Sequence, residues 1–243
     1  MRPGVAGADH ADAKITISPF RRPCKNNRLA LFLRRERQFQ PKAVPVLPMK
    51  RILVINNYDS FVYNLVQLVR ESPLRPTYEL MLNDQIDYGR LDEFGGILLS
   101  PGPGVPAEAH GLLPLIRRCH TTHPLLGVCL GHQAIAEALG GHLNALPAPK
   151  HGHRSPLRLT DVRDPLWQDA PAEIYGGRYH SWVADPASLP AELAVSSVDE
   201  EGNIMSFYHR RYPVFGLQFH PESFLSNCGR RLIDNWLALT ADK

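Results

Sequence analysis

One cysteine of this chain stands where a nucleophile would need to stand. Cys129 lies in "PLLGVCLGHQAIAEALGG" (124–141), with Gly127 and Gly131 two residues away on either side. The apolar run before Cys129 predicts a buried strand, and the pattern after it predicts a helix. A nucleophile on so sharp a turn requires small neighbours, and the N-terminus of the following helix favours a thiolate. A buried cysteine that only fills a tight turn fits the same residues equally well.

A histidine followed by a glutamate supplies the acid–base chemistry that a thiolate requires. In "LQFHPES" (217–223), His220 ends an apolar strand, Pro221 prevents a helix, and Glu222 lies two residues further on. In extended backbone His220 and Glu222 lie on the same side, where a carboxylate orients an imidazole and stabilises its cation. Taken alone, His-Pro-Glu is more typical of a plain turn, so its catalytic interpretation depends on Cys129.

The turn "LSPGPG" (99–104) follows another buried strand and exposes backbone N–H groups. Gly102 and Gly104 let the backbone approach a ligand closely, which suits this turn to completing an oxyanion hole. The N–H of Leu130, directly after Cys129, is a further donor for an oxyanion. Without Cys129 and His220, a plain strand-ending loop would be the favoured interpretation.

The elements that must position these groups alternate between strand and helix. Apolar runs predict strands at 51–57, 77–83, 96–100 and 124–129, and helical spacing predicts a helix from Phe61, with Asp59 or Ser60 as its N-cap, and helices at 109–119, 131–139 and 228–240. This alternation predicts an α/β domain with parallel strands and crossover helices. After residue 150, short strand-like segments predict antiparallel additions to the sheet. Cys129 and His220 both end strands, so we expect them to meet at the carboxyl edge.

The first 48 residues differ in composition from the rest. They carry ten Lys and Arg against three Asp and Glu, whereas residues 49–243 carry seventeen against twenty-one. We interpret 1–48 as an extension outside the fold, either disordered, upstream of the true start, or a targeting segment, and 49–243 as one domain. Because the basic excess belongs to 1–48, the net charge of +3 does not indicate nucleic-acid binding. No apolar run approaches the ~20 residues of a membrane span, so no membrane association is expected.

The cysteine and histidine spacings do not predict a metal site. The four cysteines are Cys24, Cys119, Cys129 and Cys228. None forms a C-x-x-C pair, which predicts free thiols in a reducing, cytoplasmic compartment. Cys119, His120 and His123 form C-H-x-x-H without a second ligand pair, so we interpret them as surface residues at a helix end, and "HGH" (151–153) as a solvent-facing loop or subunit contact. No P-loop or dinucleotide motif is present, so no cofactor is expected on this chain.

Together, these stretches resemble the class-I, triad-type glutamine amidotransferases, and among them the glutaminase components of anthranilate synthase and aminodeoxychorismate synthase. The resemblance covers residues 50–240 and implies a flavodoxin-like open sheet, with a mostly parallel core and antiparallel additions. The motifs that carry it are "NNYDSFVYNL" (56–65), "LSPGPGVPAEA" (99–109), "LLGVCLGHQAIAEALGG" (125–141), "HGHRSPL" (151–157), "RYHSWVADPASLPAEL" (178–193) and "GLQFHPESFLS" (216–226).

The resemblance also implies a role for each site residue. Cys129 would attack the side-chain amide of L-glutamine and form a γ-glutamyl thioester, with His220 as base and acid and Glu222 orienting it. The N–H groups of Gly104 and Leu130 would bind the oxyanion. Glutamine recognition is implied for Gly102, Pro103, Gly104, Gln133, Ser181 and Trp182. Trp182 departs from the leucine usual in "YHSL", but its implied contribution is backbone.

The resemblance further implies that the released ammonia passes to a separate chorismate-binding synthase subunit, which makes anthranilate or 4-amino-4-deoxychorismate. Two other classes of function stay open. The chain is alternatively a free-standing cysteine amidase or γ-glutamyl hydrolase on the same fold, or a non-catalytic regulatory subunit. The presence of Cys129, His220 and Glu222 together weighs against the regulatory class.

Overall fold

The computed structural model describes residues 50–241. The extension predicted for residues 1–48 therefore lies outside the described residues, and the division of the chain at residue 49 stays a prediction. Among the described residues, no helix is long and apolar enough to cross a membrane.

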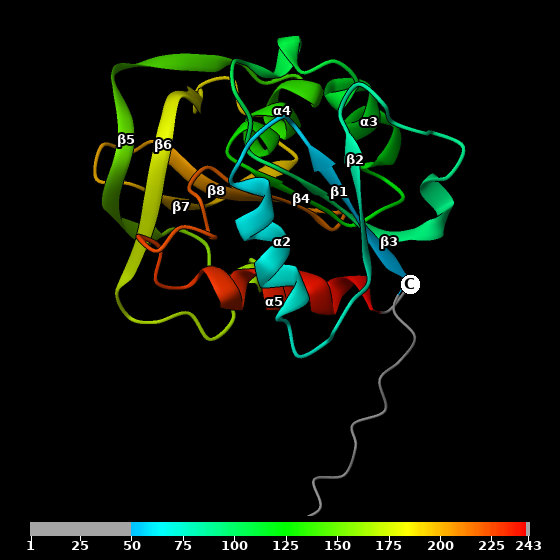
Figure 1. The fold of residues 1–243 in the computed structure, drawn as a ribbon. Coiled ribbons are helices and arrows are strands. Elements are labelled where there is room, and N and C mark those ends of the chain that lie inside the picture. Colours follow the sequence, from blue (N-terminus) through cyan, green and yellow to red (C-terminus); the bar gives the residue numbers. More distant parts are fainter. Residues whose placement is uncertain (1–49, 242–243) are drawn as a thin grey trace, which may run out of the picture. The chain divides into compact units, whose positions relative to one another are not determined.

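A single mixed sheet organises the described residues (Figure 1). Five neighbouring strands run parallel, and the strands beyond them run antiparallel. In spatial order they are β2 (Tyr78–Leu82), β1 (Arg51–Asn56), β3 (Phe94–Leu99), β4 (Leu125–Val128), β9 (Val214–Leu217), β8 (Ile204–His209), β7 (Leu193–Val198), β5 (Leu143–Leu159) and β6 (Ile174–Ala184). The direction changes at β9, which pairs parallel with β4 and antiparallel with β8. The predicted parallel core with antiparallel additions is confirmed.

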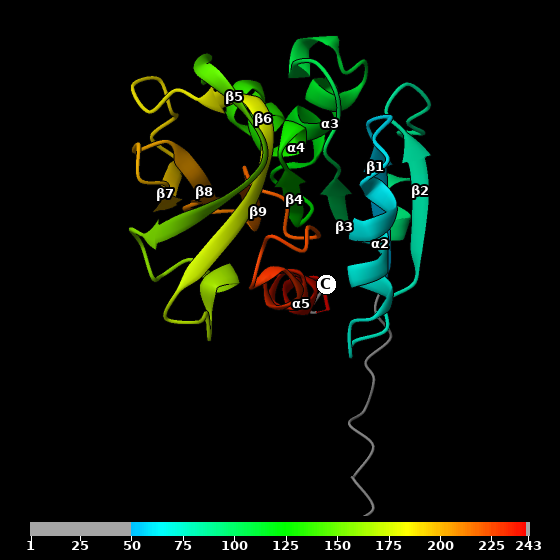
Figure 2. The ribbon, with the colours of Figure 1, turned by 60° about the vertical axis from the view of Figure 1, so that its left-hand side comes forward.

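Helices cover both faces of the parallel strands (Figures 1 and 2). Alternate residues of β1 show why: Ile52 and Val54 pack with α2 and α5, whereas Leu53 and Ile55 pack with α3 and α4. This three-layer arrangement is the predicted flavodoxin-like α/β fold. The helices are α2 (Val62–Arg70), α3 (Leu112–Cys119), α4 (Leu130–Ala138) and α5 (Gly229–Thr240), and the short 3₁₀ turns are η2 (Leu91–Glu93), η3 (Pro106–Glu108) and η4 (Pro165–Trp167).

Strand β5 is longer than the sequence predicts, because it begins at Leu143 rather than after residue 150. Its first half contains Pro147 and Pro149, which lie where the register with β6 shifts between Ala145 and Lys150. Only the last residues of β5 pair with β7, so the first half has β6 on one side alone. Proline is tolerated at such bulged, one-sided positions, where no ladder hydrogen bond is lost.

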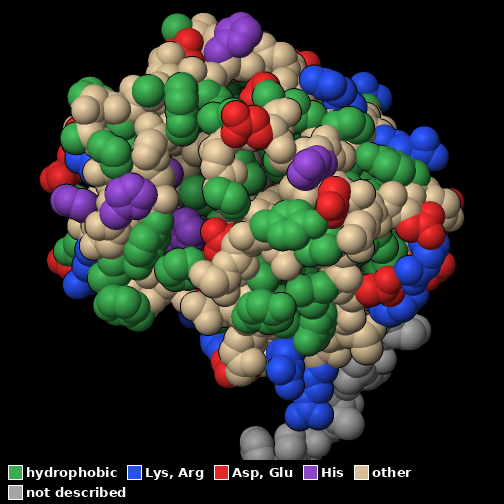
Figure 3. All heavy atoms as spheres, turned by 45° about the horizontal axis from the view of Figure 1, so that its top comes forward, with side chains coloured by type: hydrophobic (Ala, Val, Ile, Leu, Met, Phe, Trp, Pro, Cys, Tyr) green, Lys and Arg blue, Asp and Glu red, His purple; other side chains and the backbone are tan. Residues whose placement is uncertain are grey.

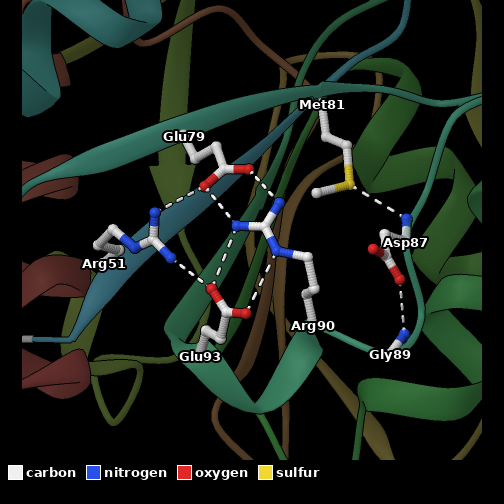
Figure 4. A network of polar contacts seen from close by, with 7 residues as sticks. All are labelled: Arg51, Glu79, Met81, Asp87, Gly89, Arg90 and Glu93. Atoms are coloured by element: carbon white, nitrogen blue, oxygen red, sulfur yellow. Dashed lines mark hydrogen bonds and ion pairs between the residues drawn. The ribbon is translucent and has the colours of Figure 1, made fainter.

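A group of ion pairs joins the edge strand β2 to its neighbours (Figure 4). Glu79 on β2 accepts from Arg51 on β1 at 2.8 Å and from Arg90 at 2.7 Å. Glu93 in η2 pairs with the same two arginines. Both guanidinium groups also lie over the ring of Phe94, at 5.3 and 5.9 Å from its centroid. These contacts tie the edge strand β2 to the start of β3.

Two local predictions are wrong. The N-cap of α2 is Phe61 rather than Asp59 or Ser60, and the Asp59 carboxylate instead accepts from the Phe61 N–H at 2.6 Å, one residue before the helix. Cys119 and His123 are not surface residues: Cys119, at the end of α3, is buried in the core, and His123 is buried with Nε2 3.1 Å from the Leu91 carbonyl oxygen. The apolar face of α3 extends to its last residue, which carries Cys119 inward.

Candidate active site

Cys129 occupies the turn between β4 and α4 in a conformation that L-residues rarely adopt. Its φ is 52° and its ψ is −100°. The neighbouring strand holds it there, because the Cys129 N–H donates to the Leu217 carbonyl at 2.8 Å. Its own carbonyl accepts from the Gln133 N–H at 3.0 Å as α4 begins. A strained residue that its surroundings hold in place is typical of a functional site.

The glycines on either side of Cys129 allow the backbones of β3, β4 and α4 to pack in direct contact. A Cβ on Gly127 would lie 2.4 Å from the Gly131 carbonyl carbon and oxygen. A Cβ on Gly131 would lie 2.6 Å from the Leu99 carbonyl oxygen of β3. The first turn of α4 therefore rests directly on β4 and β3, which aims the helix N-terminus at the cysteine.

His220 and Glu222 form a buried pair after β9. The His220 Nδ1 lies 2.7 Å from Glu222 Oε1, and the two side chains are 3% and 0% exposed. The His220 ring packs edge-on against Tyr179 at 4.9 Å and Phe61 at 5.4 Å between centroids. Its N–H donates to the Gly177 carbonyl at 2.8 Å, which ties it to β6. Backbone, carboxylate and two aromatic rings thus fix the imidazole.

The electrostatic surroundings favour a cationic His220. Burial alone would lower its pKa, but hydrogen bonding and charge from Cys129 and Glu222 outweigh burial and raise it. The second ring nitrogen, Nε2, is buried without a hydrogen-bond partner of ordinary geometry in residues 50–241. Hydrogen bonding and charge from Cys129 are among the causes that raise the pKa of His220, which places the sulfur close to the imidazole.

Two other buried histidines and two buried thiols are held neutral. Burial lowers the pKa of His180 and of His132 to about 3. Burial raises the pKa of Cys119 to about 11 and that of Cys228 to about 12. The described cysteines, Cys119, Cys129 and Cys228, are all free thiols, as predicted, and Cys24 lies outside the described residues.

A cavity of about 230 Å³ opens beside Cys129. The predicted site residues that line it are Gly102, Pro103, Gly104, Cys129, Gln133, Ser181 and Trp182. Leu130, His220 and Glu222 do not line it. Leu130 directly follows Cys129 as the first residue of α4, so its N–H precedes the intrahelical hydrogen bonds. The structure thus places Cys129, the "LSPGPG" turn and the predicted glutamine-binding residues around one cavity.

Three further residues line the cavity without having been predicted: His151, Tyr179 and His180. His151 lies in "HGH", interpreted above as a solvent-facing loop or subunit contact, yet it lies in β5 and reaches the cavity from the pairing with β6. Tyr179 and His180 stand in the quoted motif "RYHSW", where only Ser181 and Trp182 were assigned a role. The signal that could have found them is their place in a strand: residues on both faces of β6 are partly or fully buried, so neighbours of Ser181 and Trp182 were also candidates for the site.

Three polar side chains that no sequence pattern singled out anchor the "LSPGPG" turn. The Asn57 N–H donates to Ser100 Oγ at 3.0 Å, and the Asn57 side chain donates to the Ser100 carbonyl at 2.8 Å. Asn83 in turn donates to Asn57 Oδ1 at 3.1 Å. Gly102 comes so close to this anchor that a Cβ would lie 2.6 Å from that of Asn57 and 2.5 Å from Leu130 Cδ2.

A buried chain of hydrogen bonds leads from β7 to the cavity. Arg178 pairs with Asp199 at 2.5 Å, and both side chains are 2% exposed. The Arg178 Nε donates to His180 Nε2 at 3.1 Å, so the neutral imidazole carries its proton on Nδ1 and donates it to the Trp182 carbonyl at 3.0 Å. That carbonyl also accepts from Gln133 Nε2 at 2.8 Å. The backbone carbonyl of Trp182 is therefore occupied by protein donors.

No group of three or more His, Cys, Asp or Glu side chains in residues 50–241 is arranged to hold a metal ion.

Comparison with known proteins gives a consistent result. The family model described as glutamine amidotransferase class-I matches residues 53–239. "Anthranilate synthase component 2" of Mycobacterium tuberculosis is 43% identical over 194 residues, covering 77% of this chain and 81% of that protein. The protein of the same name from Thermus thermophilus is 42% identical over 197 residues, covering 77% of this chain and 91% of that protein.

A solved structure agrees with these relatives. A crystal structure from Thermoplasma acidophilum, named as one subunit of GMP synthase, superposes with a TM-score of 0.71 at 25% identity and covers 80% of this chain and 95% of its own. The family model spans the elbow at Cys129, the "LSPGPG" turn and the His220–Glu222 pair alike. The chain belongs to the class-I glutamine amidotransferase family.

Proposed function

We propose that this chain is the glutaminase subunit of a chorismate-using synthase, with anthranilate synthase as the favoured complex. The observation that carries the catalytic part is the strained Cys129 beside the buried His220–Glu222 pair. The relatives named anthranilate synthase component 2 support the choice of complex, because a second component implies a first.

The proposed reaction proceeds through a thioester. The Cys129 sulfur, whose proton has already passed to His220, attacks the side-chain carbonyl carbon of L-glutamine. The carbonyl oxygen becomes an oxyanion between the N–H groups of Leu130 and Gly104. His220 returns the proton to the amide nitrogen, the C–N bond breaks and ammonia leaves. Water, deprotonated by His220, then hydrolyses the thioester to glutamate and the free thiol.

The orientation of Gln133 supports an amino-acid substrate. Both hydrogens of its side-chain amide are used, one on the Trp182 carbonyl and one on Gln218 Oε1 at 3.2 Å. The remaining polar atom, Oε1, is a pure acceptor, and Gln133 lines the cavity. An acceptor there fits the α-ammonium group of glutamine. The cavity, about 230 Å³, also fits a single amino acid better than a peptide.

Exposed aromatic side chains support a protein partner over this site. Tyr58, Tyr63 and Phe224 are 54%, 66% and 91% exposed, and Trp182 is 37% exposed at the cavity. Tyr58 follows β1, and Phe224 lies two residues after Glu222. Figure 3 looks onto the end of the molecule where the parallel strands finish, and hydrophobic and histidine side chains are interspersed there with polar atoms. Aromatic residues are enriched at protein–protein interfaces, so these four side chains are candidates for contact with the partner subunit.

The test compares two nitrogen sources in the complex of this chain with its chorismate-binding subunit. We expect Cys129→Ala to reduce product formation from chorismate and glutamine by at least about 10³-fold. Product formation from chorismate and ammonium should be unchanged, because ammonium bypasses the glutaminase. Wild-type rates with glutamine in the Cys129→Ala complex would contradict the proposal.

Mass spectrometry of the product identifies the pathway. Anthranilate is the expected product, and 4-amino-4-deoxychorismate would assign the chain to the other synthase. Full glutaminase activity of the chain by itself, unaffected by any chorismate-binding subunit, would instead support the free-standing amidase.

A further inference from the structure

A buried glutamine, Gln218, lies beside the nucleophile without lining the cavity. Gln218 directly follows β9 and is 0% exposed. Strands β9 and β4 are parallel neighbours that pair Leu217 with Val128, so Gln218 and Cys129 leave the sheet side by side. The Gln218 N–H donates to the Met205 carbonyl at 2.9 Å, which holds it from the other neighbouring strand. Its side chain can therefore act only on the groups that the two strands place around it.

A series of hydrogen bonds fixes the orientation of the side-chain amides of Gln133 and Gln218. The series starts at the Trp182 carbonyl, which can only accept, so the NH₂ group of Gln133 must face it. The second hydrogen of the same NH₂ group reaches Gln218 Oε1 at 3.2 Å. Gln218 thus turns its oxygen toward Gln133 and its own NH₂ group toward Cys129, where Nε2 lies 3.8 Å from Sγ. An amide flip at either position would set like groups against each other.

The last donor of this hydrogen-bond series is Gln218 Nε2, which faces the sulfur of Cys129. Such a donor stabilises a thiolate more than a thiol, because a hydrogen bond to the charged form is the stronger one. The other end of the series is the oxygen of Gln133, a residue that lines the cavity. A single buried side chain thereby connects the atom expected to bind the substrate with the atom expected to attack it.

We propose that Gln218 is a positioning residue, which holds Gln133 in its acceptor orientation and donates to the sulfur of Cys129. The inference rests on the proposed glutaminase function for its substrate, but its effect on the sulfur is independent of glutamine. Gln218 holds no reacting atom and acts through Gln133 and Cys129. Other titratable groups surround the sulfur and must stay unchanged in the test: they are His220 and Glu222 after β9, His180 on β6, His151 on β5 and His132 on α4.

The first experiment measures the pH dependence of iodoacetamide alkylation at Cys129, by peptide mass spectrometry of the full chain. Gln218→Met keeps the length of the side chain and removes the donor. We expect the midpoint of the pH–rate profile to move up by about one unit, equivalent to about a tenfold loss of alkylation rate at pH values below both midpoints. Gln168→Met, on an exposed side chain after η4, is the matched control and should overlay the wild type. A folded Gln218→Met protein with the wild-type midpoint would overturn the proposal.

The second experiment measures glutamine kinetics in the complex with the synthase subunit. Gln133→Met and Gln218→Met should each raise the KM for glutamine about tenfold, and the double variant should lose little more than either single variant. Additive losses would show that Gln218 does not act through Gln133. If no variant or wild-type complex uses glutamine, the proposed function fails, while the alkylation profile still decides the contact with sulfur.

A measurement on the wild-type chain covers the case in which Gln218→Met does not fold. In a chain labelled with ¹⁵N at glutamine side chains, one amide pair should titrate with the same midpoint as alkylation at Cys129. The same signal should shift when Cys129 is alkylated. If no glutamine amide signal changes with pH at that midpoint or on alkylation of Cys129, the proposal is overturned without any substitution.

Discussion

At the scale of single residues, the backbone of Cys129 is held against its own preference. A φ of 52° with a ψ of −100° suits glycine and costs an L-residue on the order of 1–3 kcal/mol. The hydrogen bond to Leu217 and the start of α4 impose this conformation. The gain is a sulfur that stands clear of both elements and faces the cavity.

This strain predicts an inverted order of stability at position 129. Cys129→Gly should be more stable than Cys129→Ala by about 1 kcal/mol, because glycine adopts the conformation without a Cβ penalty. Urea unfolding of the two inactive variants provides the measurement. Ala138→Gly, at the end of α4, provides the control and should show the ordinary order, with alanine the more stable. An alanine advantage at both positions would mean that Cys129 is unstrained.

At the scale of elements, the site depends on how closely α4 sits on the sheet. The contacts of Gly127 with Gly131, and of Gly131 with Leu99, leave no room for a side-chain atom. The "LSPGPG" turn is held by the two hydrogen bonds between Asn57 and Ser100, which join the ends of β1 and β3. The geometry around Cys129 is therefore a property of backbone packing as much as of the catalytic side chains.

Gly127→Ala should separate α4 from β4, because its Cβ would lie 2.4 Å from the Gly131 backbone. We expect a loss of about 1–3 kcal/mol in the free energy of unfolding, and a loss of glutaminase activity in the fraction that stays folded. Gly89→Ala is the matched control, since its Cβ meets only Asp87 Oδ1, at 3.3 Å, and should stay within about 0.5 kcal/mol of the wild type. Urea unfolding and glutamine hydrolysis at one temperature provide the two readouts. Equal effects of both substitutions would refute the packing argument.

The sequence predicts these elements well where one interaction dominates. The runs "RILVIN" and "FGGILL" are buried on both faces, and their apolar composition alone is sufficient to place β1 and β3. The prediction fails where tertiary context decides. The prolines of early β5 favour a loop until β6 is known to pair on one side only. Arg178 and Gln218 are polar residues with no local signal, and their roles depend on Asp199 and Cys129, which lie 21 and 89 positions away.

At the scale of the whole molecule, the antiparallel half contains a buried polar cluster that depends on pH. Asp164 is 1% exposed and accepts from Ser196 at 2.6 Å and from the Leu166 N–H at 2.9 Å. Ser196 bonds to Ser206 on β8, which accepts from Trp167 Nε1 at 3.1 Å. Burial raises the pKa of Asp164 to about 6, against the smaller opposing effect of these hydrogen bonds.

Asp164 should therefore make the folded chain less stable as pH rises. Its ordinary pKa is 3.8, so between about pH 4 and 6 the folded state holds a proton that the unfolded state has lost. Its stabilising contribution is complete below pH 4 and is lost as pH rises through 6, by on the order of 2 kcal/mol. Asp164→Asn removes this dependence, so the stability of the wild type minus that of the variant should fall from pH 4.5 to pH 7.

Thermal or urea unfolding across that range measures the difference. Asp169→Asn makes the same chemical change on an exposed side chain and provides the control. A difference between wild type and Asp164→Asn that stays constant from pH 4.5 to 7 would show that Asp164 is ionised in the folded chain throughout.

The change of strand direction at β9 separates the residues around the cavity into two groups. Cys129 and His220 follow two adjacent parallel strands, whereas Ser181, Trp182 and His151 line the cavity from the paired strands β5 and β6 of the antiparallel half. The proposed reactive centre and much of the cavity wall therefore belong to separately paired parts of one sheet. Grafting a different β5–β6 hairpin is accordingly the route by which this scaffold can acquire new substrate selectivity while retaining its chemistry.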